Sequence, residues 1–284
     1  DYWGEHASAK RDYTLKATAG TDYKIRIEYM QAGAEALLRF DLGIYRHISP
    51  EMVVDRVKEA DIVIFAGGIS PSLEGEEMYS VNSPGFAGGD RTSIELPQVQ
   101  RDILKALKKA GKKVVFVNCS GSAVALVPEM ESCDAILQAW YPGQSGGLAV
   151  ADVLFGDFNP SGKLPVTFYK NTDQLPDFED YSMKNRTYRY MTEVGYGLSY
   201  TTFDISKGRL NKKTISAGQD LNFKVNVKNT GKYDGAEVIQ VYVRKVDDAE
   251  GPIKSLRAFR RVPLKAGETC VVSIDLLPTT FEFF

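Results

Sequence analysis

Hydrophobic and polar positions alternate along the first part of the chain, between residues 12 and 45. The stretch "YKIRIEYM" (residues 23–30) places two tyrosines and two isoleucines on one face and charged side chains on the other. This period of two predicts a half-buried antiparallel strand, preceded by a turn at "TAGTD". Because two or three strands do not fold alone, we interpret residues 1–47 as the end of a β-rich module.

The pattern changes between residues 48 and 168, where continuous apolar runs alternate with amphipathic segments. The runs "DIVIFAGG", "KKVVFVNCSG" and "DAILQAWYPG" predict three buried strands. Strands that alternate with helices predict a parallel α/β sheet, so the fold class is α/β for this domain. In such a sheet the functional loops follow the carboxyl ends of the strands.

Three helices are predicted around these strands. The first, "SPEMVVDRVKEA", has Ser49 as its N-cap and Pro50 at its first position. The third is "SGGLAVADVLFG", and "SAVALVPEME" is a further helical or loop segment. The second, "ELPQVQRDILKALKKAG", ends at Gly111 and carries an apolar face formed by Val99, Ile103, Leu104 and Leu107.

Strand patterns return after a loop-rich linker over residues 169–203. In residues 204–284, "LNFKVNVKNTGKYDGAEVIQVYVR" reads as two alternating strands around a turn, and "CVVSIDL" as another. Strands without a helical pattern between them predict a small β-sandwich, which we expect to be truncated.

Composition narrows the function classes without naming one. The chain has 284 residues, 43% hydrophobic and 25% charged, with a net charge of −2, so it shows no basic footprint for nucleic acid. Two histidines and three widely spaced cysteines argue against a metal site or a disulfide framework and predict buried free thiols at Cys119 and Cys133. No apolar run is long enough for a membrane span, and "DYWGEHASAK" is no signal peptide, so we expect a segment of a longer protein.

Candidate chemistry gathers in the loop after the first predicted strand, "GGISPSLEGEEMYSVNSPGFAGGDR" (residues 67–91). Glu74, Glu76 and Glu77 lie there at the carboxyl end of a buried strand, where a glutamate can act as a general acid. The alternative is that all three are solvated loop charges. A phosphate-binding turn at "AGG" is a rival interpretation, but no Gly-Lys-Ser/Thr follows it.

Other residues near strand ends allow a structural or a functional interpretation. We expect Asp90 to cap the following helix or to pair with Arg91. Trp140 and Tyr141 either contact a ligand or fill the edge of the sheet. Three glycines at the next turn are expected to allow tight backbone packing: Gly143, Gly146 and Gly147.

Several blocks together resemble glycoside hydrolase family 3, the β-glucosidases and β-xylosidases. These are "GGISPSLEGEEM", "GGDRTSIELP", "AWYPGQSGGLAVADVLFGDFNPSGKLPVTFYK", "LPDFEDYSMKNRTYRY" and "GYGLSYTTF", and the resemblance runs from about residue 49 to the end. It implies an α/β sandwich over residues 48–168, then the linker, then a fibronectin type III-like domain over 204–284. Residues 1–47 are similar to the tail of a protective-antigen-type carbohydrate module.

The resemblance also implies where the catalytic groups lie. The family's nucleophile is an aspartate, usually in a Ser-Asp-Trp motif of a (β/α)8 barrel, and this sequence contains neither. Its acid/base is a glutamate on the loop after the first strand, which matches Glu74, with Glu76 as the alternative. The linker "RTYRYMTEVGYGLSY" is shorter than the family's usual pattern, so substrate contacts from it stay unassigned.

A retaining, exo-acting β-glycosidase is therefore the expected function, most closely a β-glucosidase, with the barrel domain of the same protein as partner. A β-xylosidase or α-arabinosidase of this family and a non-catalytic carbohydrate-binding protein are the alternatives. We expect an oligosaccharide or glycoside substrate, no metal or organic cofactor, no nucleic-acid or membrane partner, and a periplasmic or secreted location. Whether the protein forms a homodimer stays open.

Overall fold

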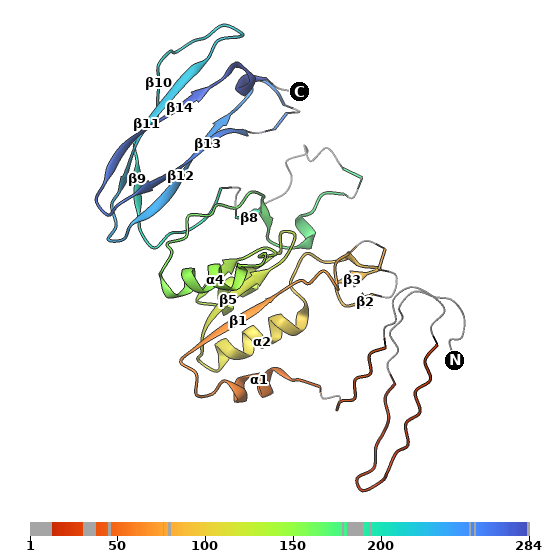
Figure 1. Cartoon of the computed structure of the whole chain (residues 1–284). Coiled ribbons are helices and arrows are strands. Elements are labelled where there is room, and N and C mark those ends of the chain that lie inside the picture. The colour runs from red at the N-terminus through yellow and green to blue at the C-terminus, as the bar shows by residue number, and fades with distance from the viewer. Residues whose placement is uncertain are drawn as a thin grey trace. The chain divides into compact units, whose positions relative to one another are not determined.

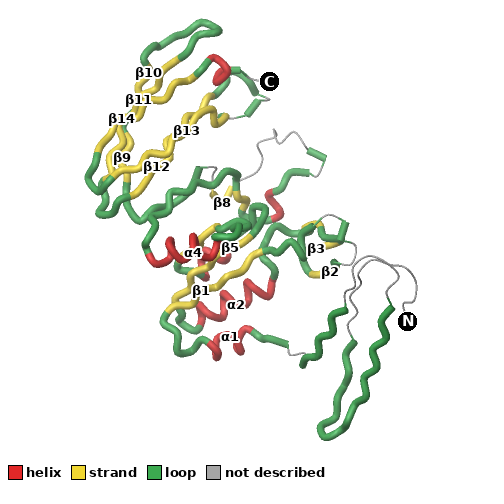
Figure 2. The backbone as a smooth tube through the Cα atoms, in the orientation of Figure 1, coloured by secondary structure: helices red, strands yellow, loops and turns green. Residues whose placement is uncertain are grey.

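The computed structural model describes residues 13–30, 38–44, 47–75, 77–78, 81–177, 179–180, 190–192, 195–249, 251–252 and 254–282 (Figures 1 and 2). The chain divides between residues 47 and 48 into two compact units.

The first unit carries the predicted turn but not the predicted strand. The turn lies at residues 19–20, where Gly20 has a φ of +76°. The described backbone over 13–30 and 38–44 forms neither helix nor strand, and the five apolar side chains of "YKIRIEYM" are 41–56% exposed. The half-buried strand was therefore a wrong prediction for these residues. An alternating face is buried only when a second layer covers it, and the described part of this unit provides none. Its assignment to a carbohydrate module stays a prediction.

The second unit contains the predicted parallel sheet. Strands β1 (Ile62–Gly68), β5 (Lys113–Cys119) and β6 (Ala135–Gln138) lie in the order β1-β5-β6 and run parallel. β1 and β5 pair along their whole length, from Ile62 opposite Lys113 to Gly68 opposite Cys119. The loops that leave the ends of these strands therefore start side by side.

The predicted helices precede or follow these strands along the chain, and α1 and α2 lie side by side (Figure 1). α1 (Pro50–Arg56) begins as predicted, with Ser49 accepting a hydrogen bond from the Met52 amide at 3.4 Å. α2 (Gln98–Lys109) buries Leu104 and Leu107, but Val99 is 55% exposed. The remaining helices are α3 (Val127–Ser132) and α4 (Gly146–Phe155), which ends at a left-handed Gly156.

The core of this domain lies between α2 and one face of the sheet. It is built from fully buried aliphatic and aromatic side chains, including Leu104, Leu107, Val114 and Phe116. The described cysteines are all free; Cys133 is buried as predicted, whereas Cys119 is only partly buried.

The charged loop after β1 has its own small sheet, which sequence patterns did not predict. Strands β2 (Asn82–Ser83), β3 (Phe86–Ala87) and β4 (Asp90–Arg91) pair in antiparallel order β2-β3-β4. Phe86 anchors this sheet in the main core. The loop is therefore a built feature of the domain.

The C-terminal part forms a β-sandwich, as predicted. One sheet contains β9 (Phe203–Ile205), β10 (Arg209–Leu210), β11 (Leu221–Asn229) and β14 (Thr269–Leu276); the other contains β12 (Gly235–Val243) and β13 (Ser255–Leu264). The linker contributes β7 (Phe168–Tyr169), β8 (Tyr190–Thr192) and the short helix η1 (Thr172–Gln174), and a second one, η2 (Pro278–Phe281), follows β14. Apolar residues of both sheets share one core.

Candidate active site

The loop that carries the candidate glutamates leaves β1 through a fixed turn. Gly68 has a φ of +122°, and a Cβ there would lie 1.9 Å from the Cys119 carbonyl oxygen. The Gln100 side chain accepts a hydrogen bond from the Gly68 amide (2.8 Å) and donates one to its carbonyl (2.7 Å). Only glycine fits this position, so the start of the loop is held against both β5 and α2.

The backbone around Glu74 is held on both sides. The Glu74 amide donates to the Ser70 carbonyl at 3.1 Å, and the Gly75 amide donates to the Gly89 carbonyl at 3.3 Å. Gly89 has a φ of +90°, and a Cβ there would lie 2.1 Å from the Gly75 carbonyl oxygen. Glu74 therefore sits at a defined point between β1 and the small sheet.

The Glu74 side chain points toward residues that follow β5. Its Oε1 accepts a hydrogen bond from Ser122 Oγ at 3.1 Å and lies 3.9 Å from Arg91 Nη1. The side chain keeps 25% of its surface exposed. A carboxyl group that is fixed at one side and open to solvent at the other can exchange a proton with a bound molecule.

Arg91 is the cationic neighbour of this carboxyl group, with a side chain only 10% exposed. Its Nη1 donates to Ser122 Oγ (2.7 Å) and to the Ala123 carbonyl (3.0 Å). Burial lowers the pKa of Arg91, and the charges of Glu74, Glu95 and Tyr141 oppose that shift. Arg91 thus joins the loop after β1 to the loop after β5, as the Glu74–Ser122 hydrogen bond also does.

The expected roles of Asp90 were wrong. The N-cap of α2 is Pro97, without a side-chain hydrogen bond, and the ion pair of Arg91 in the described residues is with Glu74. Arg91 lies in β4, which turns its side chain toward Ser122 and away from the start of the helix. Sequence patterns also missed Ser122, which carries no signal beyond its position after a buried strand.

Glu95 forms a second carboxylate network beside Arg91. It accepts hydrogen bonds from the Ser93 hydroxyl, from Thr172 Oγ1 (2.6 Å) and from the Thr172 amide (3.0 Å). Burial would raise the pKa of Glu95, but the hydrogen bonds from Ser93 and Thr172 outweigh it and lower the pKa to about 2. Glu95 is therefore a permanent carboxylate that fastens the linker to this edge of the domain.

The other predicted residues have mixed outcomes. Glu76 lies outside the described residues, and Glu77 is exposed with a φ of 53°. Trp140 packs edge-on against Phe168 with ring centres 6.0 Å apart, which fills the sheet edge, whereas Tyr141 is 45% exposed.

Only one of the three glycines at the β6–α4 turn needs close packing. A Cβ at Gly146 would lie 2.3 Å from the Pro142 side chain, whereas Gly143 and Gly147 have nothing within 4 Å. The prediction for the latter two was therefore wrong.

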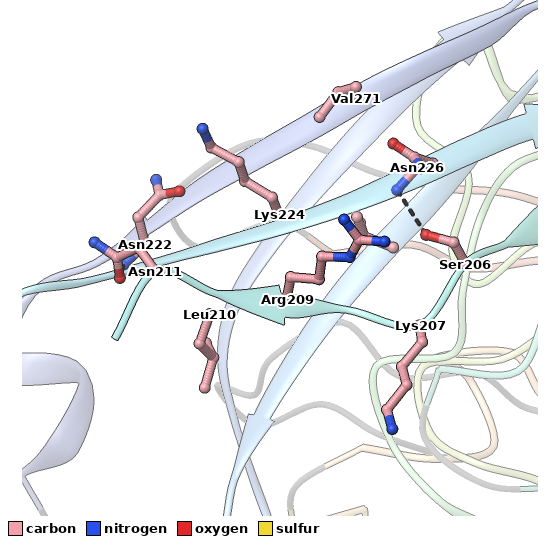
Figure 3. Close-up of a pocket in the computed structure, with 10 residues that line it drawn as sticks. Ser206, Lys207, Arg209, Leu210, Asn211, Asn222, Lys224, Asn226 and Val271 are labelled. Carbon is pink, nitrogen blue, oxygen red and sulfur yellow. Dashed lines mark hydrogen bonds between the residues drawn. The ribbon is translucent and has the colours of Figure 1, made fainter. Parts of the chain in front are cut away.

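A separate hollow of about 310 Å³ lies on the β-sandwich, lined by residues of β10, β11 and β14 and of the segment between β9 and β10 (Figure 3). Lys207, Arg209 and Lys224 line it together with asparagine, serine and aliphatic side chains, and no carboxylate or histidine is among its lining residues. It therefore offers no side chain for acid/base chemistry near neutral pH. Nor do the described residues contain a cluster of three or more potential metal ligands.

Comparison with known proteins decides the family. The model of the glycosyl hydrolase family 3 C-terminal domain matches residues 5–200, and that of a fibronectin type III-like domain matches residues 237–284. The chain belongs to glycosyl hydrolase family 3. The resemblance based on the strand-end loop and the "AWYPGQ" block is confirmed.

Proteins of two named activities are similar to this chain. A xylan 1,4-beta-xylosidase of Xylanibacter ruminicola is 54% identical over 275 residues, which cover 95% of this chain and 32% of that protein. A periplasmic beta-glucosidase of Salmonella typhimurium is 38% identical, covering 83% of this chain and 32% of that protein. The solved structure of a β-glucosidase from Erythrobacter marinus superposes with a TM-score of 0.71 at 35% identity, covering 82% of this chain and 31% of that one.

The chain thus spans about a third of the length of these relatives. The two family models and the superposition on the Erythrobacter marinus structure agree with the α/β domain and the sandwich found here.

Proposed function

We propose that the protein is a retaining, exo-acting β-glycosidase and that Glu74 is its general acid/base. The observation that carries this proposal is the Glu74 carboxyl group itself. It lies at the carboxyl end of a parallel strand, fixed by backbone contacts, hydrogen-bonded to Ser122 and one-quarter exposed. Such strand ends are where α/β sheets place their reactive groups.

The proposed mechanism divides the work between this chain and the rest of the protein. An aspartate of the barrel domain, outside this sequence, attacks the anomeric carbon and forms a glycosyl-enzyme. Glu74 donates a proton to the departing oxygen and then takes a proton from the incoming water. Retaining enzymes hold the two carboxyl groups about 5–5.5 Å apart, so Glu74 has to face the barrel.

Two sugars are candidates for the released unit. The names of the relatives include β-glucosidases and β-xylosidases, and β-D-glucose is the sugar that we expected first. The second candidate is β-D-xylose. Its support is the 54% identity to the xylan 1,4-beta-xylosidase, which exceeds the 38% identity to the periplasmic beta-glucosidase. Comparing kcat/KM on nitrophenyl β-D-glucoside, β-D-xyloside and α-L-arabinoside with the complete protein decides between them.

The decisive test of Glu74 is the Glu74→Ala variant of the complete protein. Loss of the general acid should slow hydrolysis of substrates with poor leaving groups about 10²- to 10⁴-fold. Hydrolysis of dinitrophenyl glycosides should suffer less in its first step, because such leaving groups need no proton. Azide should restore turnover and give a glycosyl azide of retained configuration.

Two glutamates of the same loop serve as controls. Glu77→Ala should retain activity, because Glu77 is an exposed side chain. If Glu76→Ala shows the azide rescue and Glu74→Ala does not, the assignment moves to Glu76. If neither variant loses activity, the acid/base is another residue. If the complete wild-type protein hydrolyses none of these glycosides, the alternative of a non-catalytic carbohydrate-binding protein is supported.

We further propose a periplasmic or secreted location. The support is the periplasmic beta-glucosidase among the relatives. Among the helices that the structure describes, none combines the length and hydrophobicity of a membrane span. Cell fractionation with an antibody to this chain tests the location.

A further inference from the structure

We propose that Arg91 and Ser122 form a relay that stabilises the ionised form of Glu74. They act as positioning residues, and the inference rests on the proposed role of Glu74 as acid/base. The relay would determine the pH range in which Glu74 serves as acid in the first half of the reaction and as base in the second.

The direction of the hydrogen bonds carries the argument. Arg91 Nη1 can only donate, so Ser122 Oγ is the acceptor in their 2.7 Å contact. The single hydroxyl proton of Ser122 then remains for Glu74, whose Oε1 lies 3.1 Å away. A hydroxyl group polarised by a guanidinium donates best to a negatively charged oxygen. The chain Arg91–Ser122–Glu74 therefore favours the carboxylate over the carboxylic acid.

The relay is held in place from behind. Arg91 also donates to the carbonyl groups of Ala123 (3.0 Å) and Ser93 (3.3 Å). Beneath Ser122, the fully buried Ser120 donates to the Ser122 carbonyl at 2.9 Å and accepts from Gln138 of β6 at 3.2 Å. Two strands of the sheet thus fix Ser122 relative to Arg91, as a positioning role requires.

One nitrogen of the Arg91 guanidinium group donates no hydrogen bond to a described residue. Its Nη2 is buried without a hydrogen-bond acceptor among the residues that the structure describes. Its Nη1 lies 3.9 Å from Glu74 Oε1, too far for a hydrogen bond but close enough for charge attraction. A small rotation of the Glu74 side chain would bring its carboxylate into direct contact with Arg91.

Arg91 is the charged group that faces Glu74 among the described residues. Glu95 and Tyr141 in turn face Arg91, and the exposed Glu77 lies on the loop of Glu74 itself. Since Glu95 stays ionised to about pH 2, as its pKa indicates, it does not change charge in the range of an activity assay. Among the described residues around Glu74, Arg91 and Ser122 are therefore the ones whose substitution tests the relay.

The two half-reactions require opposite forms of Glu74. The first step needs the acid, so the alkaline limb of kcat/KM against pH reports its loss of a proton. Hydrolysis of the glycosyl-enzyme needs the carboxylate, so the acid limb of that step reports the same group. Weakening the relay should move both limbs to higher pH.

The experiment uses the complete enzyme with Ser122→Ala and, separately, Arg91→Gln and Arg91→Lys. Loss of one hydrogen bond to a charged oxygen changes its proton affinity about tenfold, so Ser122→Ala should move the alkaline limb up by about one pH unit. Arg91→Gln should move the alkaline limb at least as far. Arg91→Lys keeps the positive charge and should therefore move the limb less than Arg91→Gln does. Dinitrophenyl glycosides give the pH profile of the second step.

Two matched controls separate electrostatics from stability. Ser72→Ala removes an exposed hydroxyl of the same loop, whose partner is Ser70, and should leave both limbs in place. Arg101→Lys perturbs another arginine, partly buried and paired with the buried Glu129, and should alter stability without moving the limbs.

The outcome tells failure of the inference from failure of the proposed function. If Glu74→Ala shows the leaving-group dependence and azide rescue, but Ser122→Ala and both Arg91 variants keep the wild-type limbs, the relay is refuted and Glu74 remains the acid/base. If Glu74→Ala lacks those signatures, the proposed function fails instead. Should Arg91→Gln not fold, Ser122→Ala and Arg91→Lys still decide.

Discussion

The Glu95 network makes a prediction that needs no substrate. Glu95→Gln replaces a carboxylate by a neutral group of the same shape and leaves Ser93 and Thr172 without their charged acceptor. Two backbone amides report on this network directly, because the Thr172 amide donates to Glu95 and the Ile94 amide donates to Thr172 Oγ1. In the Glu95→Gln variant, the contact between residue 95 and Thr172 should therefore open more often than in the wild type.

The magnitude follows from the pKa of Glu95. A fall from its ordinary value of 4.5 to about 2 corresponds to an upper limit of about 3 kcal/mol. Solvent screens a partly exposed carboxylate, so we expect about 1–2 kcal/mol. Because the folded pKa is the lower one, this stabilisation is present above about pH 4.5 and is lost as the pH falls through about 2.

Hydrogen exchange read by mass spectrometry provides the assay, with wild type and variant compared at the same pH. At pH 7, peptides containing Ile94 or Thr172 should exchange roughly 5- to 30-fold faster in Glu95→Gln, which corresponds to 1–2 kcal/mol of local opening. The difference should shrink as the labelling pH approaches 2. The exposed Glu77→Gln is the matched control and should change neither peptide.

Equal exchange of both peptides at pH 7 would refute the reasoning, because the carboxylate would then contribute nothing to the contact. A difference that persists unchanged toward pH 2 would refute the charge-based part of it.

The remaining predictions concern Gly68, at the start of the loop after β1, and the ion pair between Arg101 and Glu129. Gly68→Ala should lower the thermal midpoint more than Gly111→Ala, since both have positive φ but a Cβ at Gly68 would lie 1.9 Å from a carbonyl oxygen and one at Gly111 meets nothing within 4 Å; calorimetry of both variants checks this. Burial raises the pKa of Glu129, against the opposing charge of Arg101, so its contribution to stability should fall as the pH rises above about 4.5. In the Glu129→Gln variant, the free energy of unfolding measured in urea should therefore depend less on pH in that range. An unchanged pH dependence would contradict this prediction.

Much of the second unit could be predicted from the pattern of the sequence. The apolar runs predicted β1, β5 and β6, and the cap at Ser49 and Gly111 just after α2 predicted helix ends, because these signals act over neighbouring residues. The failed strand in residues 23–29 shows the limit of the same reasoning. Its alternation was real, but burial depends on a covering layer that the pattern cannot provide.

The candidate site divides in the same way. The sequence by itself determined that a glutamate-rich loop follows a buried parallel strand, and the family blocks singled out Glu74 within it. Only the tertiary structure decided its neighbours, Ser122 and Arg91, since Ser122 is 48 residues from Glu74 and 31 from Arg91. Such contacts depend on the register of β1 against β5 and on the small sheet that turns Arg91 inward, and periodicity, which acts locally, carries no information about either.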